Sequence, residues 1–285
     1  LLGAFLASFS PISNALGWFG HQSVCQLAFD ALPNNKQKVI NELLTFMPQE
    51  QQNILNKYSR NKRGTKITFA QSCTWADVIK NQPGYKQYKS WHYINVDRQT
   101  TTVDKSTCSK NCITKAIDIH KQQLIDAKDS WEKAQALMFL SHWLGDIHQP
   151  LHVSFASDLG GNKIKIEPLN GRRCNNLHWL WDDCLIKQDY KKPAELVSKL
   201  ANKWQGALLS DWQNSDQYTW ANESLTMLRK AEFGYCEVNQ NGVCQAPSSL
   251  PVVLKSDYSE HYSPELEIRV LQAAVRLQYL LDEAL

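Results

Sequence analysis

The residues with the clearest chemical potential lie between positions 142 and 152, in the run His-Trp-Leu-Gly-Asp-Ile-His-Gln-Pro-Leu-His. His142 and Asp146 are four residues apart, so on a helix they share one face and can point at one centre. Pro150 interrupts an ordinary helix, so His152 approaches that centre from a different backbone direction. Two imidazoles and a carboxylate are typical zinc ligands. The simpler interpretation is a helix end whose dipole favours histidine.

The same His-x-x-x-Asp spacing recurs at His178 and Asp182, which favours metal binding over a helix end. The full set of candidate ligands is His21, Asp77, His92, His142, Asp146, His152, His178 and Asp182. Eight ligands, mostly imidazole, are too many for one tetrahedral zinc. They suit a cluster of two or three ions, and Asp146 is the natural bridge because a carboxylate has two oxygens. Only folding can join residues so far apart in the sequence.

Apolar residues at helical spacing predict the elements that position these ligands. Helices are expected at 21–32, 36–46, 73–80 with Thr74 as cap, 113–125, 131–146, around His178 and Asp182, 193–209, 219–233, and from Ser263 to the end, with Pro264 in the first turn. Residues 49–70 are polar and poorly patterned, and 234–262 read as irregular. Residues 91–96 look strand-like but are too short to force a sheet, and a turn at 160–162 precedes a short hairpin strand at 163–166. The predicted class is all-α, mostly helical, in a single domain.

The composition allows one large core, because 43% of the 285 residues are hydrophobic and ten are Trp. The net charge of +3 does not by itself indicate a nucleic-acid binder. Bound Zn²⁺ would add positive charge that the formal count omits.

Residues 1–9 are apolar and uncharged, too few to span a bilayer, and typical of the central part of a secretory signal. Cleavage after Ala15 would make Leu16 the first mature residue, and cleavage two residues later would make it Trp18. We therefore expect a signal-peptide remnant at 1–15 and one domain at 16–285, although a buried N-terminal strand or helix is the alternative.

The eight cysteines are an even number and fit an oxidised protein that is secreted or periplasmic. Short loops favour the pairs Cys108–Cys112 and Cys236–Cys244. A bridge across the second His-Asp pair would join Cys174 to Cys184, which leaves Cys25 with Cys73. The absence of a Cys-x-x-Cys motif argues against a thiolate zinc site.

Taken in order, the motifs resemble those of a known family. They are His21, Trp75-Ala-Asp77, Trp91-His-Tyr-Ile94, the run from His142 to His152, Gly160-Gly-Asn162, Asn176-Leu-His-x-x-Trp-Asp182 and Trp220-Ala-Asn-Glu-Ser224. This order is similar to that of the zinc-dependent single-strand-specific nucleases of the nuclease S-one/P-one family, also called class I nucleases. The resemblance implies a mostly helical fold of the phospholipase C/nuclease P-one type, with a small β-hairpin and three Zn²⁺ at the base of a cleft.

The resemblance also implies how the ligands divide among the three ions. One zinc would take Asp77, His92, His142 and Asp146, and a second would take His152, His178 and Asp182. The third would take His21, the other oxygen of Asp146, and the α-amino group and carbonyl of the first mature residue. The family usually begins with Trp five residues before this His, whereas this chain has Leu16 there. The site would therefore be complete only after the signal is removed.

The implied reaction is hydrolysis of a phosphodiester by a zinc-bound hydroxide, because zinc lowers the pKa of its water from ~15.7 to about 7. Asp77 and Lys80 match positions where the family has its catalytic group, with Lys80 facing the developing phosphorane charge. Asn162 is expected to donate to a phosphate oxygen. The plainer interpretations are a solvated surface lysine for Lys80 and an ordinary turn residue for Asn162.

The preference for single strands would come from a narrow cleft with a stacking ring, for which Tyr93 is the candidate. Asn95 lies where some relatives use an Asp to recognise a base, and an amide both donates and accepts, so base preference does not carry over. Tyr93 is equally compatible with a core position. Expected substrates are single-stranded DNA and RNA and 3′-mononucleotides, acted on by a monomer without a membrane or a stable protein partner.

Two other functions are compatible with such a ligand set. A zinc-dependent phospholipase C has related architecture but needs an apolar rim for its lipid, and nothing in the sequence reads as a membrane-docking helix. A zinc-buffering protein would have closed tetrahedral sites without a position for water.

Overall fold

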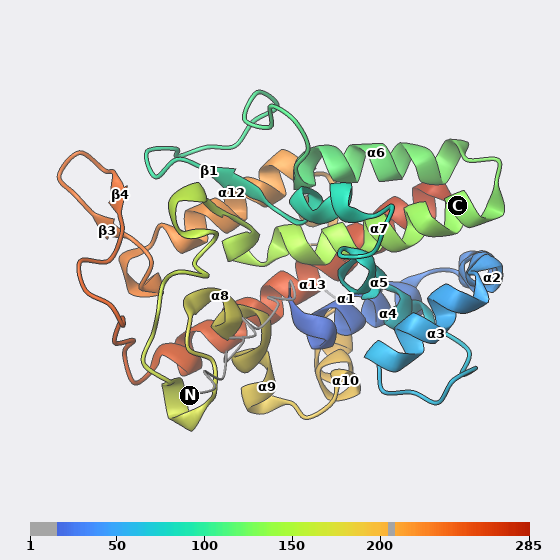
Figure 1. Cartoon of the computed structure of the whole chain (residues 1–285), viewed down its shortest axis with the longest axis horizontal. Helices are drawn as coiled ribbons and strands as arrows, with labels where there is room; N and C mark the ends of the chain where they lie inside the picture. Colours follow the sequence, from blue (N-terminus) through green and yellow to red (C-terminus); the bar gives the residue numbers. More distant parts are fainter. Residues whose placement is uncertain (1–15, 205–208) are drawn as a thin grey trace, which may run out of the picture.

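The computed structural model describes residues 16–204 and 209–285 (Figure 1). Residues 1–15, and with them the expected signal peptide, lie outside the described residues, as do 205–208. The helices are α1 (Gly17–Ala31), α2 (Asn34–Leu43), α3 (Gln49–Tyr58), α4 (Phe69–Ser72), α5 (Trp75–Ile79), α6 (Ile113–Asp126), α7 (Ser130–His148), α8 (Leu177–Trp179), α9 (Ile186–Asp189), α10 (Pro193–Lys203), α11 (Leu209–Gln213), α12 (Gln217–Leu228) and α13 (Tyr258–Ala284). The strands are β1 (Ile94–Val96), β2 (Val153–Phe155), β3 (Glu237–Val238) and β4 (Cys244–Gln245). The all-α prediction is confirmed.

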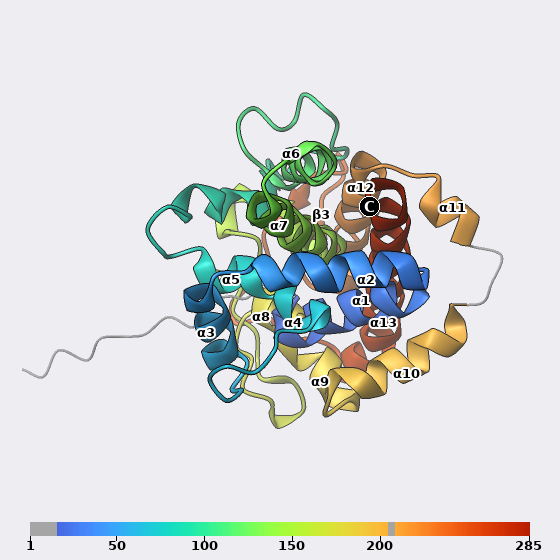
Figure 2. The same ribbon diagram turned by 90° about the vertical axis from the view of Figure 1, so that its right-hand side faces the viewer.

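Helix α7 lies at the centre of the fold, with α6 along one side and α1, α12 and α13 packed around the others (Figures 1 and 2). Every side chain from Ala136 to His148 is buried. A helix that is buried all round must satisfy any polar side chain it carries from its neighbours. His142 and Asp146 therefore have to find their partners on other elements.

The two small sheets differ from the sequence-based expectation. β1 pairs in parallel with β2, Ile94 opposite Val153, so the 91–96 segment does join a sheet. The expected hairpin strand at 163–166 is wrong, because Lys165 and Ile166 form only isolated bridges. The hairpin is β3–β4, within the stretch that had read as irregular.

Three helix predictions also need correction: one helix was not predicted, one begins earlier than expected, and one lacks the expected cap. α3 lies in the segment 49–70 that showed no pattern. α13 begins at Tyr258 rather than Ser263 and contains Pro264, because the buried rings of Tyr258 and Tyr262 pack beside Trp181 and extend the helix upstream. Thr74 does not cap α5; a capping box at Thr68 starts α4 instead.

Four disulfides hold the chain, with the predicted pairing: Cys25–Cys73, Cys108–Cys112, Cys174–Cys184 and Cys236–Cys244. The first ties α1 to the segment just before α5. Among the described residues, no helix has the length and apolar character needed to cross a membrane.

Candidate metal centre

The fold brings all eight candidate ligands together beside the C-terminal half of α7, and each is at most 6% exposed. They come from seven secondary-structure elements. His21 lies on α1, Asp77 on α5, His92 at the end of a 3₁₀ helix (Lys86–His92), His142 and Asp146 on α7, His152 on a 3₁₀ helix (Pro150–His152), His178 on α8, and Asp182 on the π turn that follows (Leu180–Cys184).

Three groups of side chains have donor atoms within 4.8 Å of one another. These groups are His21 with His142 and Asp146, Asp77 with His92 and His142, and His152 with His178 and Asp182. Asp146 uses both oxygens: Oδ1 lies 3.1 Å from His21 Nε2, and Oδ2 lies 2.9 Å from His92 Nδ1 and 3.2 Å from His142 Nε2. This is the arrangement a bridging carboxylate requires.

Backbone carbonyls orient three of the imidazoles. The Nδ1 atom of His142 lies 2.7 Å from the Cys73 carbonyl oxygen, that of His152 lies 2.6 Å from the His92 carbonyl, and that of His178 lies 2.6 Å from the Gly160 carbonyl. A carbonyl can only accept, so each Nδ1 carries the proton and each Nε2 offers its lone pair to the cluster. Metal-binding histidines are typically held in this way.

The donor set fits metal ions. Asp77 Oδ2 and His152 Nε2 are buried cluster atoms without a hydrogen-bond partner in the described chain, and His21 Nε2 and Asp146 Oδ1 lie 3.1 Å from each other without forming a hydrogen bond. Buried polar atoms are rarely left in this state, because each would lose its hydration without compensation. Divalent cations among these atoms would supply the missing interaction.

Electrostatics favour the ionised carboxylates. Burial by itself raises the pKa of Asp146, but the His142 and His152 imidazoles outweigh it and hold that pKa well below its ordinary value. Burial likewise opposes ionisation of Asp77, and Lys80 and His142 reverse the effect. Burial lowers the pKa of His92 to about 4, which keeps that ring neutral, as a ligand must be.

The start of α1 packs directly against the cluster. Leu16, with φ of 39° in the left-handed region, buries its side chain against Gly20, where an added Cβ would lie 2.4 Å from Leu16 Cγ. A Cβ on Gly17 would lie 2.6 Å from the Asp182 carbonyl oxygen. Trp18, by contrast, is 37% exposed. Gly17, next to Leu16, thus packs against the segment that carries Asp182.

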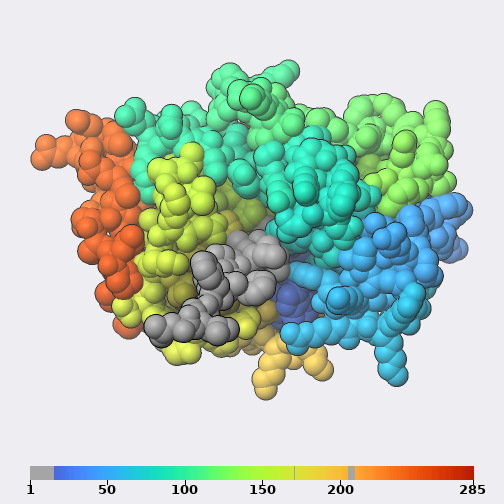
Figure 3. All heavy atoms as spheres, viewed as in Figure 1, coloured from blue at the N-terminus to red at the C-terminus, as the bar shows by residue number. Residues whose placement is uncertain are grey.

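A cleft of about 410 Å³ opens over the cluster. It is lined by Lys80, Asn81, Lys89, His92, Tyr93, Asn95, Leu151, His152, Leu159, Gly160, Asn162 and His178. Lys80, Tyr93, Asn95 and Asn162, the four residues expected to contact the substrate, therefore line one cavity. Three candidate metal ligands line it with them: His92, His152 and His178. Residues 80–95 (teal) and 155–175 (yellow-green) reach the surface on the same face of the molecule, as Figure 3 shows.

The four residues differ in how they are held. Lys80 Nζ lies 2.8 Å from Asp77 Oδ1, and Asp77 raises the pKa of this lysine against the effect of burial. Tyr93 is 38% exposed, which excludes the core alternative. Asn95 is half-buried on β1. Asn162 donates one amide hydrogen to the Leu159 carbonyl at 2.8 Å, so its side chain also closes its own turn.

Sequence reasoning missed two residues of the site. Gln149 is fully buried and donates from Nε2 to Asp182 Oδ1 at 2.6 Å, while its Oε1 accepts from the Leu151 amide. No local pattern marks Gln149, because its partner Asp182 lies 33 residues away in the sequence. Lys89 is an exposed residue of the 3₁₀ helix that ends at His92 and adds a second cation to the cleft wall.

Two histidines left out of the ligand set have other polar partners. His148 Nε2 lies 2.7 Å from Arg276 Nη1, and His120 Nδ1 lies 2.8 Å from the Ala116 carbonyl oxygen and 3.1 Å from Trp143 Nε1. Cys174 and Cys184 lie near Asp183, but their sulfurs are joined in a disulfide and offer no thiolate.

All the known proteins described below as similar to this chain are nucleases or endonucleases. The model of the S1/P1 nuclease family matches residues 16–285. Endonuclease 3 of Arabidopsis thaliana is 32% identical over 222 residues, which cover 71% of this chain and 69% of that protein. Endonuclease 4 of the same plant is 29% identical over 293 residues, covering 95% and 90%. Nuclease S1 of Aspergillus oryzae is 28% identical over 173 residues, covering 58% and 53%.

Proposed function

Since the chain belongs to the S1/P1 nuclease family and is therefore a phosphodiester hydrolase, we propose that it cuts single-stranded DNA and RNA with three Zn²⁺, leaving 5′-phosphate products. It would also act on 3′-mononucleotides. The observation that carries this proposal is the buried cluster of imidazoles and carboxylates at the floor of an open cleft. The open cleft also argues against a zinc-buffering protein, whose metal sites would be closed.

The ligands would divide as the three side-chain groups suggest. Asp77, His92, His142 and Asp146 would hold one ion, His152, His178 and Asp182 another, and His21, Asp146 and the Leu16 backbone the third. Zinc bound there would supply a Lewis acid and an acidic water. Asp146 would hold two ions at a fixed separation, because its two oxygens already face different imidazoles.

The cleft residues would handle the substrate. Lys80, fixed by Asp77, keeps its charge in the cleft and would face the phosphate as negative charge develops there. Asn162 has a second amide hydrogen to offer a phosphate oxygen. Tyr93 presents an exposed ring on which one unpaired base can stack, and such stacking is worth about 1–3 kcal/mol per base.

Export is part of the proposal. Four disulfides are typical of proteins that fold in an oxidising compartment. The family match beginning at Leu16 supports removal of residues 1–15 as a signal peptide. The amine freed at Leu16 would then join His21 at the third ion.

The proposal is tested with protein that starts at Leu16, by measuring zinc per chain and the cleavage of single-stranded polynucleotide, duplex DNA and phosphatidylcholine. We expect about three zinc ions per chain, cleavage of single strands only, loss of activity on chelation and its return with Zn²⁺. Cleavage of phosphatidylcholine in place of polynucleotide would identify a phospholipase instead. A chain that still carries residues 1–15 should have low activity; full activity there would reject the role of the Leu16 amine.

A further inference from the structure

Asp158 is a buried carboxylate that the proposed reaction does not use. It ends a 3₁₀ helix (Ala156–Asp158) at the start of the turn formed by residues 159–162. Its Oδ1 accepts from the Gly161 amide at 2.7 Å and from the Tyr235 hydroxyl at 2.5 Å, and its Oδ2 accepts from Arg98 Nη2. The carboxylate therefore binds its own turn and two distant segments at once.

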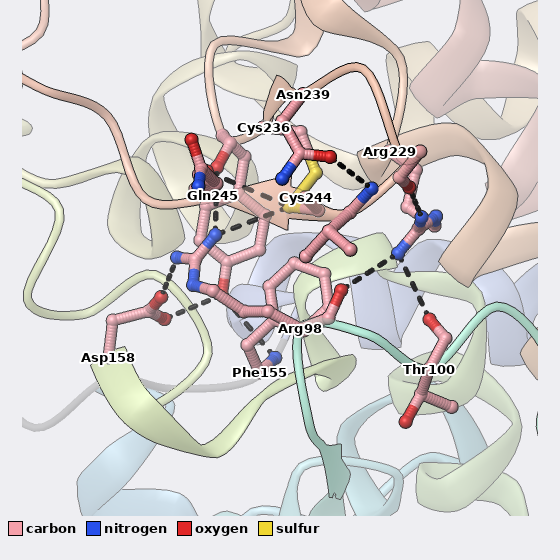
Figure 4. The surroundings of a disulfide bond; sticks show 12 residues. Arg98, Thr100, Phe155, Asp158, Arg229, Cys236, Asn239, Cys244 and Gln245 are labelled. Carbon is pink, nitrogen blue, oxygen red and sulfur yellow. Dashed lines mark hydrogen bonds and ion pairs between the residues drawn. A yellow bond between two sulfur atoms is a disulfide. The ribbon is translucent and has the colours of Figure 1, made fainter.

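Arg98 is held as firmly as Asp158 (Figure 4). Its guanidinium lies against two stacked rings, 4.7 Å from the centre of Phe155 and 5.1 Å from that of Tyr235. It also donates to Cys244 Sγ at 3.2 Å, in the disulfide that closes the β3–β4 hairpin. The Arg98–Asp158 pair thus joins the loop after β1, the turn after β2 and the base of the hairpin.

The turn that Asp158 holds would not keep its shape unaided. Leu159, Gly160 and Gly161 all have positive φ, of 56°, 65° and 78°. The left-handed conformation costs a residue with a side chain roughly 1–2 kcal/mol, and it persists only where the surroundings determine it. An added Cβ on Gly160 would lie 2.8 Å from the Leu151 carbonyl oxygen, so the turn also fits closely against its neighbours.

The turn touches the site at two places. The Gly160 carbonyl accepts from His178 Nδ1 at 2.6 Å and so sets the direction of His178 Nε2. Leu159 and Asn162 line the cleft, and Tyr93 and Asn95 line it from the segment that leads into Arg98. A shift of the turn would turn the imidazole and change the width of the cleft.

We infer that Asp158, held by Arg98 and Tyr235, is a positioning residue that aims the His178 imidazole at its metal and fixes the cleft wall opposite Tyr93. The inference rests on the proposed function, because it assigns His178 to a zinc ion. Outer partners of metal-binding histidines typically change metal affinity by about 10–100-fold when removed.

The test compares two matched pairs of variants. Asp158→Asn removes the charge. Tyr235→Phe removes the hydroxyl that donates to Asp158 and accepts from the Phe155 amide at 3.4 Å, but keeps the ring against Arg98. Glu267→Gln and Tyr190→Phe are the controls, because Tyr190 donates to the buried Glu267 carboxylate on α13 in the same way, away from the cleft. Zinc affinity is measured by chelator competition, thermal stability by circular dichroism, and KM and kcat on a single-stranded polynucleotide.

Asp158→Asn should weaken the least tightly bound zinc about 10–100-fold and raise KM, with a smaller change of the same kind in Tyr235→Phe. The control variants should lose comparable thermal stability and bind zinc as the original protein does. Wild-type zinc affinity in Asp158→Asn would overturn the inference; if that variant does not fold, Tyr235→Phe decides by the same criterion. Zinc uptake without nucleic-acid cleavage in the unaltered protein would reject the proposed function and leave the comparison of zinc affinities valid.

Discussion

Gln149 shows how much one neutral side chain does in this centre. Its amide hydrogen bonds to Asp182 Oδ1 and its oxygen accepts from the Leu151 backbone, so one residue fixes a ligand and the start of the turn that carries His152. An amide can do both because it donates and accepts. A carboxylate at this position would repel Asp182, and a lysine would have no acceptor.

Gln149→Leu should therefore weaken zinc binding about 10–100-fold with little change in shape, because Asp182 loses the donor that orients it. The measurement is zinc retention during titration with a chelator. Gln37→Leu is the control, since the Gln37 amide donates only to the backbone at the end of α1. Equal zinc retention in both variants would show that Gln149 does not orient Asp182.

The meeting of the candidate ligands in one cluster could be predicted from the sequence, because metal ligands must be of particular types and helical spacing puts His142 and Asp146 on one face. Gln149 could not, because its partner lies 33 residues away and a glutamine has no distinctive pattern. Asp158 was missed for the same reason: a buried carboxylate reads as an ordinary turn residue until Arg98 and Tyr235 are seen beside it. The division of the ligands among separate ions remains a prediction.

At the scale of elements, the contact between α1 and α7 determines where His21 can lie. Its imidazole stacks on His142 with the ring centres 3.8 Å apart, and its edge lies over Gly145. An added Cβ on Gly145 would lie 2.5 Å from His21 Nδ1 and 2.7 Å from Cε1. Glycine is thus required inside α7 at the point where the first helix brings its ligand.

Gly145→Ala should lower the zinc content and the stability, although alanine favours a helix by about 1 kcal/mol. The added methyl group meets a ring between two packed helices, and overpacking of this kind typically costs about 1–3 kcal/mol. Zinc per chain and the free energy of unfolding in urea are measured. Ser141→Ala, one turn earlier on α7, adds no atoms and is the control; a Gly145→Ala protein with full zinc content and higher stability would contradict this account.

The long helices were predicted well, because apolar residues recur at helical spacing along α1, α6 and α7. α3 was not, since its ten residues carry few apolar side chains and its stability comes from packing beside α5. The start of α13 was misplaced because Pro264 resembles a helix start, whereas aromatic packing of Tyr258 and Tyr262 begins the helix earlier. The β1–β2 pairing depends on a contact between segments 59 residues apart and has no local signal.

At the scale of the whole molecule, an ion network of two buried arginines and the partly buried Glu223 joins the end of α7 to α12 and α13. Arg276 donates to both oxygens of Glu223 at 2.6 and 2.7 Å, and Arg269 donates to the same carboxylate at 2.5 Å. Arg269 also donates to the His148 carbonyl at 3.1 Å, one of the last carbonyls of α7. Two helices from the last quarter of the chain thus hold the helix end that carries Asp146.

Because Glu223 can be protonated, the contribution of this network to the free energy of unfolding depends on pH. Burial opposes ionisation, but Arg276 and Arg269 lower the pKa of Glu223 below its ordinary value. A carboxyl group with a lowered folded-state pKa stabilises the fold above its unfolded-state pKa and loses that effect as the pH falls through the folded value. Glu223→Gln should therefore cost about 2 kcal/mol of unfolding free energy near pH 7, and the difference should shrink below about pH 4.

Urea unfolding of both proteins between pH 7 and pH 3 measures that difference. Glu283→Gln is the control, because the exposed Glu283–Lys121 pair should contribute at most about 1 kcal/mol at any pH. A difference for Glu223→Gln that grows as the pH falls would show that the network does not act through the ionised carboxylate.

The disulfide between Cys25 and Cys73 should form before zinc binds during production of this protein. Cys25 follows His21 by one helical turn, Cys73 precedes Asp77 by four residues, and the Cys73 carbonyl accepts from the His142 ring. While the two thiols are reduced, they are themselves good zinc ligands and would compete with the imidazoles for the proposed zinc ions. Recombinant production therefore calls for an oxidising compartment, with zinc supplied after the cysteines have paired.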